Sequence, residues 1–227
     1  MKELNLRTDI RGTYSADNEM ICLTILIINN YFKEKNLHRV DKITESLRKI
    51  KKLETETWKY SEVNERRIPV DVEAIILSGS YAHLENGSNK SNYDAEINLI
   101  KNVDIPVLGI CFGHQLIGKA FGAQLHRLTE IITGFTPVNI VEPNEIFSSW
   151  KSGSKVKVCQ NHIDYLKSNP KDFSTLATSK FYIVEAMKHK IKPIYGIQAH
   201  IERATDQHPD GLKILENFIK NVVEKHD

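Results

Sequence analysis

Residues 105–117 read Ile-Pro-Val-Leu-Gly-Ile-Cys-Phe-Gly-His-Gln-Leu-Ile, and this stretch decides the fold. Its apolar first half predicts a buried parallel strand. Apolar residues then recur at helical spacing as far as Gly122, which suits the end of a helix. Between strand and helix, Gly109 and Gly113 lie two residues on either side of Cys111, and glycines at that spacing allow a sharp turn. The pattern therefore predicts a strand–turn–helix that raises Cys111 as a nucleophile.

A cysteine at this turn has a second chemical advantage. The helix begins just behind its sulfur, and the partial positive charge of a helix N-terminus favours thiolate over thiol. The motif alone is weak, however, because cysteines that follow strands are usually plain core residues. The catalytic interpretation of Cys111 therefore depends on residues elsewhere in the chain.

Composition and charge narrow the class of protein. The chain has 227 residues, 41% hydrophobic and 26% charged, with a formal net charge of +2, which predicts one α/β domain over 1–227 and no nucleic-acid partner. Residues 1–20 are expected to be an N-terminal arm. The longest apolar stretch, 21–28, is too short to span a bilayer, so we expect no membrane partner and a cytoplasmic location. Three widely separated cysteines predict neither a disulfide framework nor a metal site.

Strand-like and helix-like patterns alternate through the first half of the chain. This alternation predicts an α/β fold whose central sheet is mostly parallel, with helices on both faces. Denser strand patterns in the second half predict a small antiparallel addition. Predicted strands lie at 21–28 (as a central strand), 58–63 (weakly), 72–77, 105–110, 123–128, 138–141, 155–160, 174–178, 181–187 and 194–199, and predicted helices at 40–53, 93–101, 112–121 and 210–224.

A second motif stands about ninety residues after Cys111. Residues 193–202, Pro-Ile-Tyr-Gly-Ile-Gln-Ala-His-Ile-Glu, predict a buried strand that ends in His200 and Glu202. Residues two apart in an extended segment point to the same side. Glu202 can then orient one imidazole nitrogen of His200 while the other nitrogen faces a cysteine, as in a catalytic triad. A surface His and Glu would give the same pattern, so the hypothesis depends on both motifs together.

Taken together, the two motifs resemble a known family. Gly-Ile-Cys-Phe-Gly-His-Gln and Tyr-Gly-Ile-Gln-Ala-His-Ile-Glu are similar to the two signatures of the class I, triad-type glutamine amidotransferases. Residues 75–80 resemble the oxyanion strand of that family, and residues 160–164 resemble its substrate-side segment. The resemblance covers about residues 72–223 and implies a flavodoxin-like sheet.

The resemblance also implies roles for individual residues. It implies a glutaminase that passes through a γ-glutamyl thioester, without cofactor or metal, and a separate synthase subunit that accepts the ammonia, since no acceptor domain is found in this chain. The implied residues are Cys111, His200 and Glu202 as the triad, the backbone N–H groups of Gly79 and Phe112 as the oxyanion hole, and Gln115, Asn161 and His162 as contacts to glutamine.

Some residues depart from the family pattern. Ser80 and Tyr81 replace a usual Gly-Pro, and Ile163 replaces a common glycine beside the substrate. Two alternatives therefore stay open: a γ-glutamyl hydrolase or peptidase that uses the same triad, and a weakly catalytic or non-catalytic binding subunit. Core packing is the simpler expectation for Cys22, Cys159 and His114, and a turn position is as good an expectation as a catalytic one for Asp164.

Overall fold

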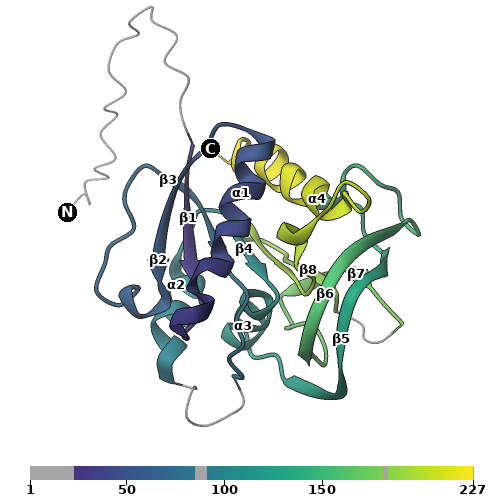
Figure 1. The fold of residues 1–227 in the computed structure, drawn as a ribbon, viewed down its shortest axis with the longest axis horizontal. Helices are drawn as coiled ribbons and strands as arrows, with labels where there is room; N and C mark the ends of the chain where they lie inside the picture. The colour runs from purple at the N-terminus through teal and green to yellow at the C-terminus, as the bar shows by residue number, and fades with distance from the viewer. Residues whose placement is uncertain (1–22, 85–90, 181–183, 227) are drawn as a thin grey trace, which may run out of the picture.

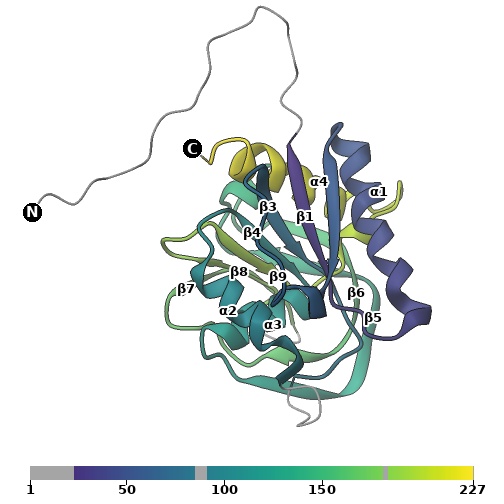
Figure 2. The same cartoon turned by 90° about the vertical axis from the view of Figure 1, so that its left-hand side faces the viewer.

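The computed structural model describes residues 23–84, 91–180 and 184–226. Within them, nine strands form one sheet in the order β2-β1-β3-β4-β9-β8-β7-β5-β6. Figures 1 and 2 show this sheet running through the molecule between the helices. The pairings from β2 to β9 are parallel and those from β9 to β6 are antiparallel. The strands are β1 (Thr24–Asn29), β2 (Glu54–Lys59), β3 (Val72–Leu77), β4 (Val107–Ile110), β5 (Leu125–Ile140), β6 (Lys155–Leu166), β7 (Phe173–Thr178), β8 (Ala186–His189) and β9 (Ile194–Ile197).

Helices cover both faces of the sheet, which confirms the predicted α/β class. Helices α1 and α4 pack together on one face, and α2 and α3 pack together on the other (Figures 1 and 2). None of the helices in the described part of the chain is long and apolar enough to cross a membrane. The helices are α1 (Asp41–Ile50), α2 (Asp94–Asn102), α3 (Phe112–Ala120) and α4 (Asp210–Phe218, continued by a π-helical turn over Ile219–Val223), with 3-10 turns η1 (Glu34–Val40), η2 (Tyr60–Glu62), η3 (Ser91–Tyr93), η4 (Glu145–Phe147) and η5 (Ile201–Arg203).

The inner parallel strands β1, β3, β4 and β9 are buried on both faces because each contributes alternate side chains to two separate cores, whereas in the parallel edge strand β2 only Trp58 is buried. In β1, Ile25 and Ile27 face the core under α1 and α4, whereas Leu26 and Ile28 face the core under α2 and α3. All four side chains are fully buried. This two-sided burial explains why the inner parallel strands read as largely apolar runs in the sequence, and the exposed edge position of β2 explains why it does not.

The sheet order also determines where a site can form. From β1 the chain crosses to β2 on one side and to β3 on the other. In open parallel sheets, ligands bind beyond the carboxyl ends of strands that lie near such a switch in direction. The carboxyl ends of β1 and β3 therefore flank the expected site, and β4 and β9 follow them in the sheet.

The structure corrects several predicted boundaries. The strands expected at 123–128 and 138–141 are one strand, β5, because β6 pairs with it over most of its length, with a register shift between Arg127 and Ile132. Residues 126–137 are half-buried or exposed, so they carry no apolar pattern that a sequence can reveal. Strand β1 lies second from the sheet edge, not centrally, because β2 takes the outer position. The predicted N-terminal arm and part of the strand at 181–187 lie outside the described residues.

Candidate active site

Cys111 lies at a strained turn between β4 and α3. It has φ 51° and ψ −101°, and among the described residues it is the one non-glycine residue with a positive φ. Such a conformation costs about 1–3 kcal/mol and persists only where its surroundings hold it. Two backbone hydrogen bonds do so here: the Cys111 N–H donates to the Ile197 carbonyl at 2.9 Å, and the Cys111 carbonyl accepts from the Gln115 N–H at 3.1 Å.

The glycine spacing around Cys111 has a packing reason. A Cβ on Gly113 would lie 2.7 Å from the Leu77 Cβ, and a Cβ on Gly109 would lie 2.6 Å from the Ile117 Cδ1. The first turn of α3 is therefore pressed against the end of β3 as closely as the backbone allows. The motif predicted from sequence forms as expected, and it forms against a neighbouring strand.

His200 and Glu202 form a buried pair directly after β9. The His200 Nδ1 lies 2.7 Å from the Glu202 Oε1, and the two side chains are 3% and 5% exposed. The expectation that both residues lie on one extended segment is wrong, because Glu202 belongs to the 3-10 turn η5. The turn brings the carboxylate back to the ring, so the pairing forms by a different backbone path.

The charges of this pair support each other. Burial lowers the His200 pKa, but the Glu202 carboxylate and the Cys111 sulfur, which also hydrogen-bonds the ring, outweigh burial and leave that pKa raised. Burial raises the Glu202 pKa, but His200 and Arg203 leave it lowered. An imidazolium held between a carboxylate and a sulfur is therefore the favoured charge state.

The two backbone N–H groups predicted to bind an oxyanion belong to segments next to His200 and Cys111. A Cβ on Gly79, which follows β3, would lie 2.7 Å from the His200 Cε1, so the Gly79 backbone touches the imidazole ring. Phe112 is the first residue of α3, and the first N–H groups of a helix have no partner within the helix. Both N–H groups predicted to bind an oxyanion thus come from segments that adjoin the triad residues.

A pocket of about 300 Å³ opens beside Cys111. All three side chains predicted to contact glutamine line it, and so do the three residues that depart from the family pattern, Ser80, Tyr81 and Ile163. The remaining wall comes from the loop after β3 and from β5 and β6. The lining residues are Ser80, Tyr81, Ala82, His83, Cys111, Gln115, Ile131, Asn161, His162, Ile163 and Asp164.

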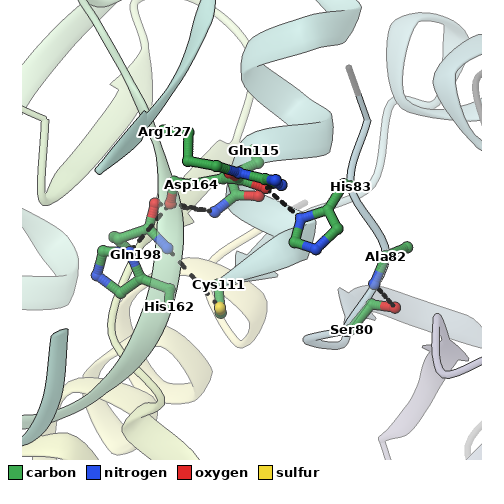
Figure 3. A network of polar contacts seen from close by, with 9 residues as sticks. All are labelled: Ser80, Ala82, His83, Cys111, Gln115, Arg127, His162, Asp164 and Gln198. Atoms are coloured by element: carbon green, nitrogen blue, oxygen red, sulfur yellow. Dashed lines mark hydrogen bonds and ion pairs between the residues drawn. The ribbon is translucent and has the colours of Figure 1, made fainter. Parts of the chain in front are cut away.

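Gln198 is a site residue that the sequence reasoning missed. Its Nε2 lies 3.7 Å from the Cys111 Sγ as a donor, and its Oε1 accepts from the Gln115 Nε2 at 3.3 Å (Figure 3). Gln115 Nε2 also donates to the Asp164 carbonyl at 2.7 Å. Gln198 is fully buried, and a lone amide in an apolar strand motif was the available signal.

Asp164 is not a turn residue but part of β6, and it ties two walls of the pocket together. Its carboxylate accepts from the His83 Nδ1 at 2.5 Å and from the Arg127 Nε and Nη2 at 2.7 and 3.1 Å (Figure 3). Burial raises the Asp164 pKa, but these two partners leave it lowered. No sequence pattern signalled His83 or Arg127.

The structure also bears on His114 and on metal binding. His114 packs in the core, as expected: it is fully buried, and burial lowers its pKa to about 3, so the ring is neutral. The part of the chain that the structure describes contains no group of three or more His, Cys, Asp or Glu side chains that would hold a metal ion.

Known proteins share this sequence and fold. The model of the family "Glutamine amidotransferase class-I" matches residues 26–222. A subunit of the glutamine-hydrolysing GMP synthase from Methanobrevibacter smithii is 37% identical over 196 residues, which cover 86% of this chain and 94% of that protein. Its counterpart from Pyrococcus abyssi is 41% identical over 150 residues, with 64% and 73% covered.

Solved structures extend the likeness to the fold. A crystal structure described as a GMP synthase subunit from Thermoplasma acidophilum superposes with a TM-score of 0.74 at 25% identity, covering 89% of this chain and 95% of that one. A glutamine amidotransferase from Thermotoga maritima, at 20% identity, shares the fold with a TM-score of 0.72, covering 89% and 99%. The matched span includes every strand and helix that positions Cys111, His200 and Glu202, and the chain belongs to the glutamine amidotransferase class-I family.

Proposed function

We propose that this protein is the glutaminase subunit of a two-chain GMP synthase. It hydrolyses the side-chain amide of glutamine and delivers the ammonia to a separate synthase subunit. The observation that carries the proposal is the buried pair of His200 and Glu202 beside a cysteine held at a strained turn. The relatives named above support the choice of pathway. We expect the enzyme to work in the cytoplasm, where its thiol stays reduced.

In the first half of the reaction, the Cys111 sulfur attacks the side-chain carbonyl carbon of glutamine. The thiol proton passes to the His200 Nε2 in this step, because Nδ1 is engaged by Glu202. The carbonyl oxygen becomes an oxyanion facing the N–H groups of Gly79 and Phe112, each worth about 3 kcal/mol of barrier. His200 then protonates the leaving nitrogen, the C–N bond breaks, and ammonia and a γ-glutamyl thioester result.

In the second half, water replaces the sulfur. His200 accepts a proton from the water as its oxygen attacks the thioester carbon, and the C–S bond breaks. The products are glutamate and the freed Cys111 sulfur beside His200, which now holds the proton that the thiol regains. Glu202 keeps the ring in one orientation throughout and stabilises its charged form.

The pocket walls suit an amino acid as substrate. The amide of Gln115 is already oriented by Asp164 and Gln198, so its position does not depend on the substrate. Such preorganised polar groups give orientation at low entropic cost. We expect Asn161 and His162, on the facing wall, to contact the α-amino and α-carboxylate end of glutamine.

Labelling with an electrophilic diazoketone analogue of glutamine tests this function. Intact mass should show one adduct on the wild-type protein and none on Cys111→Ala, with Cys159→Ala still labelled as the matched control. A parallel assay compares glutamine with γ-glutamyl peptides. Turnover of the peptides but not of glutamine would replace the proposal with the γ-glutamyl hydrolase alternative, and labelling that survives Cys111→Ala would exclude Cys111 as the nucleophile.

A further inference from the structure

A buried polar cluster lies under the loop that carries Gly79, outside the glutamine pocket. Asn30 follows β1 directly, and Glu96 stands in the first turn of α2. Both side chains are fully buried. Neither residue takes part in the steps described above, although burying a carboxyl group is costly unless it is neutral or paired.

Asn30 holds the chain on both sides of Gly79. Its backbone N–H donates to the Ser78 Oγ at 2.9 Å, and its Nδ2 donates to the Ser78 carbonyl at 3.2 Å. On the other side, the Ser80 Oγ donates to the Asn30 carbonyl at 2.7 Å. The position of Gly79, whose backbone touches the His200 ring, is therefore set by Asn30.

The start of α2 connects Asn30 to Phe112, the second predicted oxyanion donor. Tyr93, just before α2, donates its hydroxyl to the Asn30 carbonyl at 3.2 Å. The Tyr93 ring packs on the Phe112 ring with centroids 4.8 Å apart. One turn of the chain therefore supports both Gly79 and Phe112.

Glu96 binds the side chain of Asn30. The Asn30 Nδ2 donates to the Glu96 Oε1 at 3.1 Å. The remaining oxygens, Asn30 Oδ1 and Glu96 Oε2, are buried without a hydrogen-bond partner among the described residues. Both are acceptors while Glu96 is ionised, so neither can satisfy the other; a proton on Glu96 makes one of them a donor. Burial favours that proton, since it raises the Glu96 pKa to about 8.

We propose that Glu96 is a positioning residue for the oxyanion hole: in its protonated form it donates from Oε2 to the Asn30 Oδ1, while Asn30 Nδ2 donates to Oε1. This two-bond pair fixes the Asn30 side chain, and Asn30 fixes Gly79. The kinetic part of the test rests on the proposed glutaminase function, whereas the state of the Glu96 proton does not.

Two substitutions separate this role from simple packing. In Glu96→Gln the side-chain amide keeps one donor and one acceptor, so kcat for glutamine should match the wild type. Glu96→Ala removes both bonds of the pair and leaves the Asn30 side chain only its bond to the Ser78 carbonyl, so kcat should fall at least tenfold, toward the loss of about 10²–10³ that follows removal of one oxyanion donor. KM should change less, because the oxyanion develops only in the transition state.

The pH profile gives a second readout. Ionisation of Glu96 removes the donor, so wild-type kcat should decline as pH rises through about 8, and Glu96→Gln should lack that decline. Among the residues that the structure describes, Tyr93 is the titratable group that faces Glu96, with Tyr60 packed behind it. Burial raises the Tyr93 pKa further above its usual value of 10, so Tyr93 stays neutral over this range.

An infrared measurement keeps the proposal testable without activity. Wild-type protein at pH 7 should show a protonated-carboxyl band that Glu96→Gln lacks. Absence of that band overturns the proposal even if the enzyme is fully active. The proposal also fails if Glu96→Ala folds and keeps wild-type kcat, or if Glu96→Gln loses as much kcat as Glu96→Ala. If the band is present but glutamine is not hydrolysed by the wild type, the proposed function fails and the buried pair stands.

Discussion

The two halves of the sheet build the site by different physical means. The parallel half provides Gly79, Cys111 and His200 from the ends of β3, β4 and β9, where backbone packing and burial hold them. The antiparallel half provides the pocket wall on β6, where side-chain pairs such as Arg127 with Asp164 hold it, and the Arg127 side chain is 47% exposed. In the proposed mechanism the reacting groups are therefore held by backbone packing, and the substrate is held by a wall whose position depends on side-chain charges.

This difference separates what each half can tolerate. A substitution in the parallel half changes either a reacting group or a tightly packed strand–helix contact that positions one. It should therefore reduce kcat. A change in the antiparallel wall alters orientation of the part of the substrate that does not react, so it should mainly raise KM. Four substitutions test this division.

Removal of the nucleophile should have the largest effect. Cys111→Ala is expected to lower kcat for glutamine by about 10⁶-fold, the scale seen when a triad nucleophile is lost. Steady-state ammonia release measures it. Cys159→Ala should keep wild-type kcat, because burial raises the pKa of that thiol and it lies outside the pocket lining. Residual activity above about a thousandth of wild type in Cys111→Ala would mean that the parallel half does not hold the nucleophile.

Removal of the orienting carboxylate comes next. Glu202→Gln should lower kcat by up to about 10⁴-fold, because an amide at this position can fix the wrong His200 tautomer. Glu145→Gln is a suitable control, since that carboxylate pairs with Lys188 and not with His200. Equal losses in both variants would contradict the role of Glu202.

The same variant predicts a pH window for stability. The raised His200 pKa means that the pair stabilises the fold fully below pH 6.5, and that this contribution is lost as pH rises through about 9. The lowered Glu202 pKa adds a contribution that is present above 4.5 and lost as pH falls. The difference in Tm between wild type and Glu202→Gln should therefore shrink between pH 6.5 and 9, and calorimetry across that range would reveal a constant difference if the pairing were unimportant.

A change to the backbone contact should have an intermediate effect. In Gly113→Ala the added Cβ would meet the Leu77 Cβ at 2.7 Å, so α3 must shift and carry Cys111 and the Phe112 N–H with it. We expect a loss of about 1–3 kcal/mol in unfolding free energy and a fall in kcat of up to about 100-fold, the scale of a 1 Å misplacement.

Gly118→Ala is the matched control for this shift. It lies on the same helix, but its added Cβ meets the terminal methyl groups of Leu166, at 2.5 Å, and a flexible side chain can move. Denaturant unfolding and kcat should show destabilisation without the kinetic loss. If the two variants lose kcat equally, the close approach at Gly113 has no special bearing on the reaction.

The same division explains what could be predicted from the sequence. Strand β3 was predicted at its observed bounds because two-sided burial leaves a continuous apolar run, and the turn at Cys111 was predicted because only glycine fits its close contacts. The partners of Asp164 were missed because His83 and Arg127 lie 81 and 37 residues away along the chain. An ion pair between side chains that lie far apart along the chain leaves no period or spacing in a sequence.

The 3-10 turn at Glu202 and the full length of β5 were also not predicted from the sequence, because both depend on backbone contacts with other segments. The His-x-Glu spacing is compatible with an extended segment and with a 3-10 turn, and only the surrounding fold selects the turn. The exposed middle of β5 is a strand because β6 supplies its hydrogen bonds, not because of its own residues. Local sequence predicts what local packing requires, and pairing partners decide the rest.

The smallest effect should come from the pocket wall. In Asp164→Asn the carboxylate that accepts from both His83 and Arg127 is lost, so the wall loosens around the part of glutamine that does not react. We expect KM to rise about tenfold, equivalent to about 1.4 kcal/mol, with kcat nearly unchanged. His83→Ala should give a smaller rise, since its side chain is 36% exposed. Asp172→Asn, at an exposed acid outside the pocket, should change neither constant.

The substrate range of Asp164→Asn sharpens the comparison further. A looser wall should admit γ-glutamyl amides larger than glutamine, so their kcat/KM relative to glutamine should increase in this variant. A fall in kcat with KM unchanged would instead mean that Asp164 acts on the transition state, because binding lost equally from substrate and transition state cannot reduce kcat. The antiparallel wall would then belong to the reacting part of the site, and the division between the two halves of the sheet would fail at Asp164.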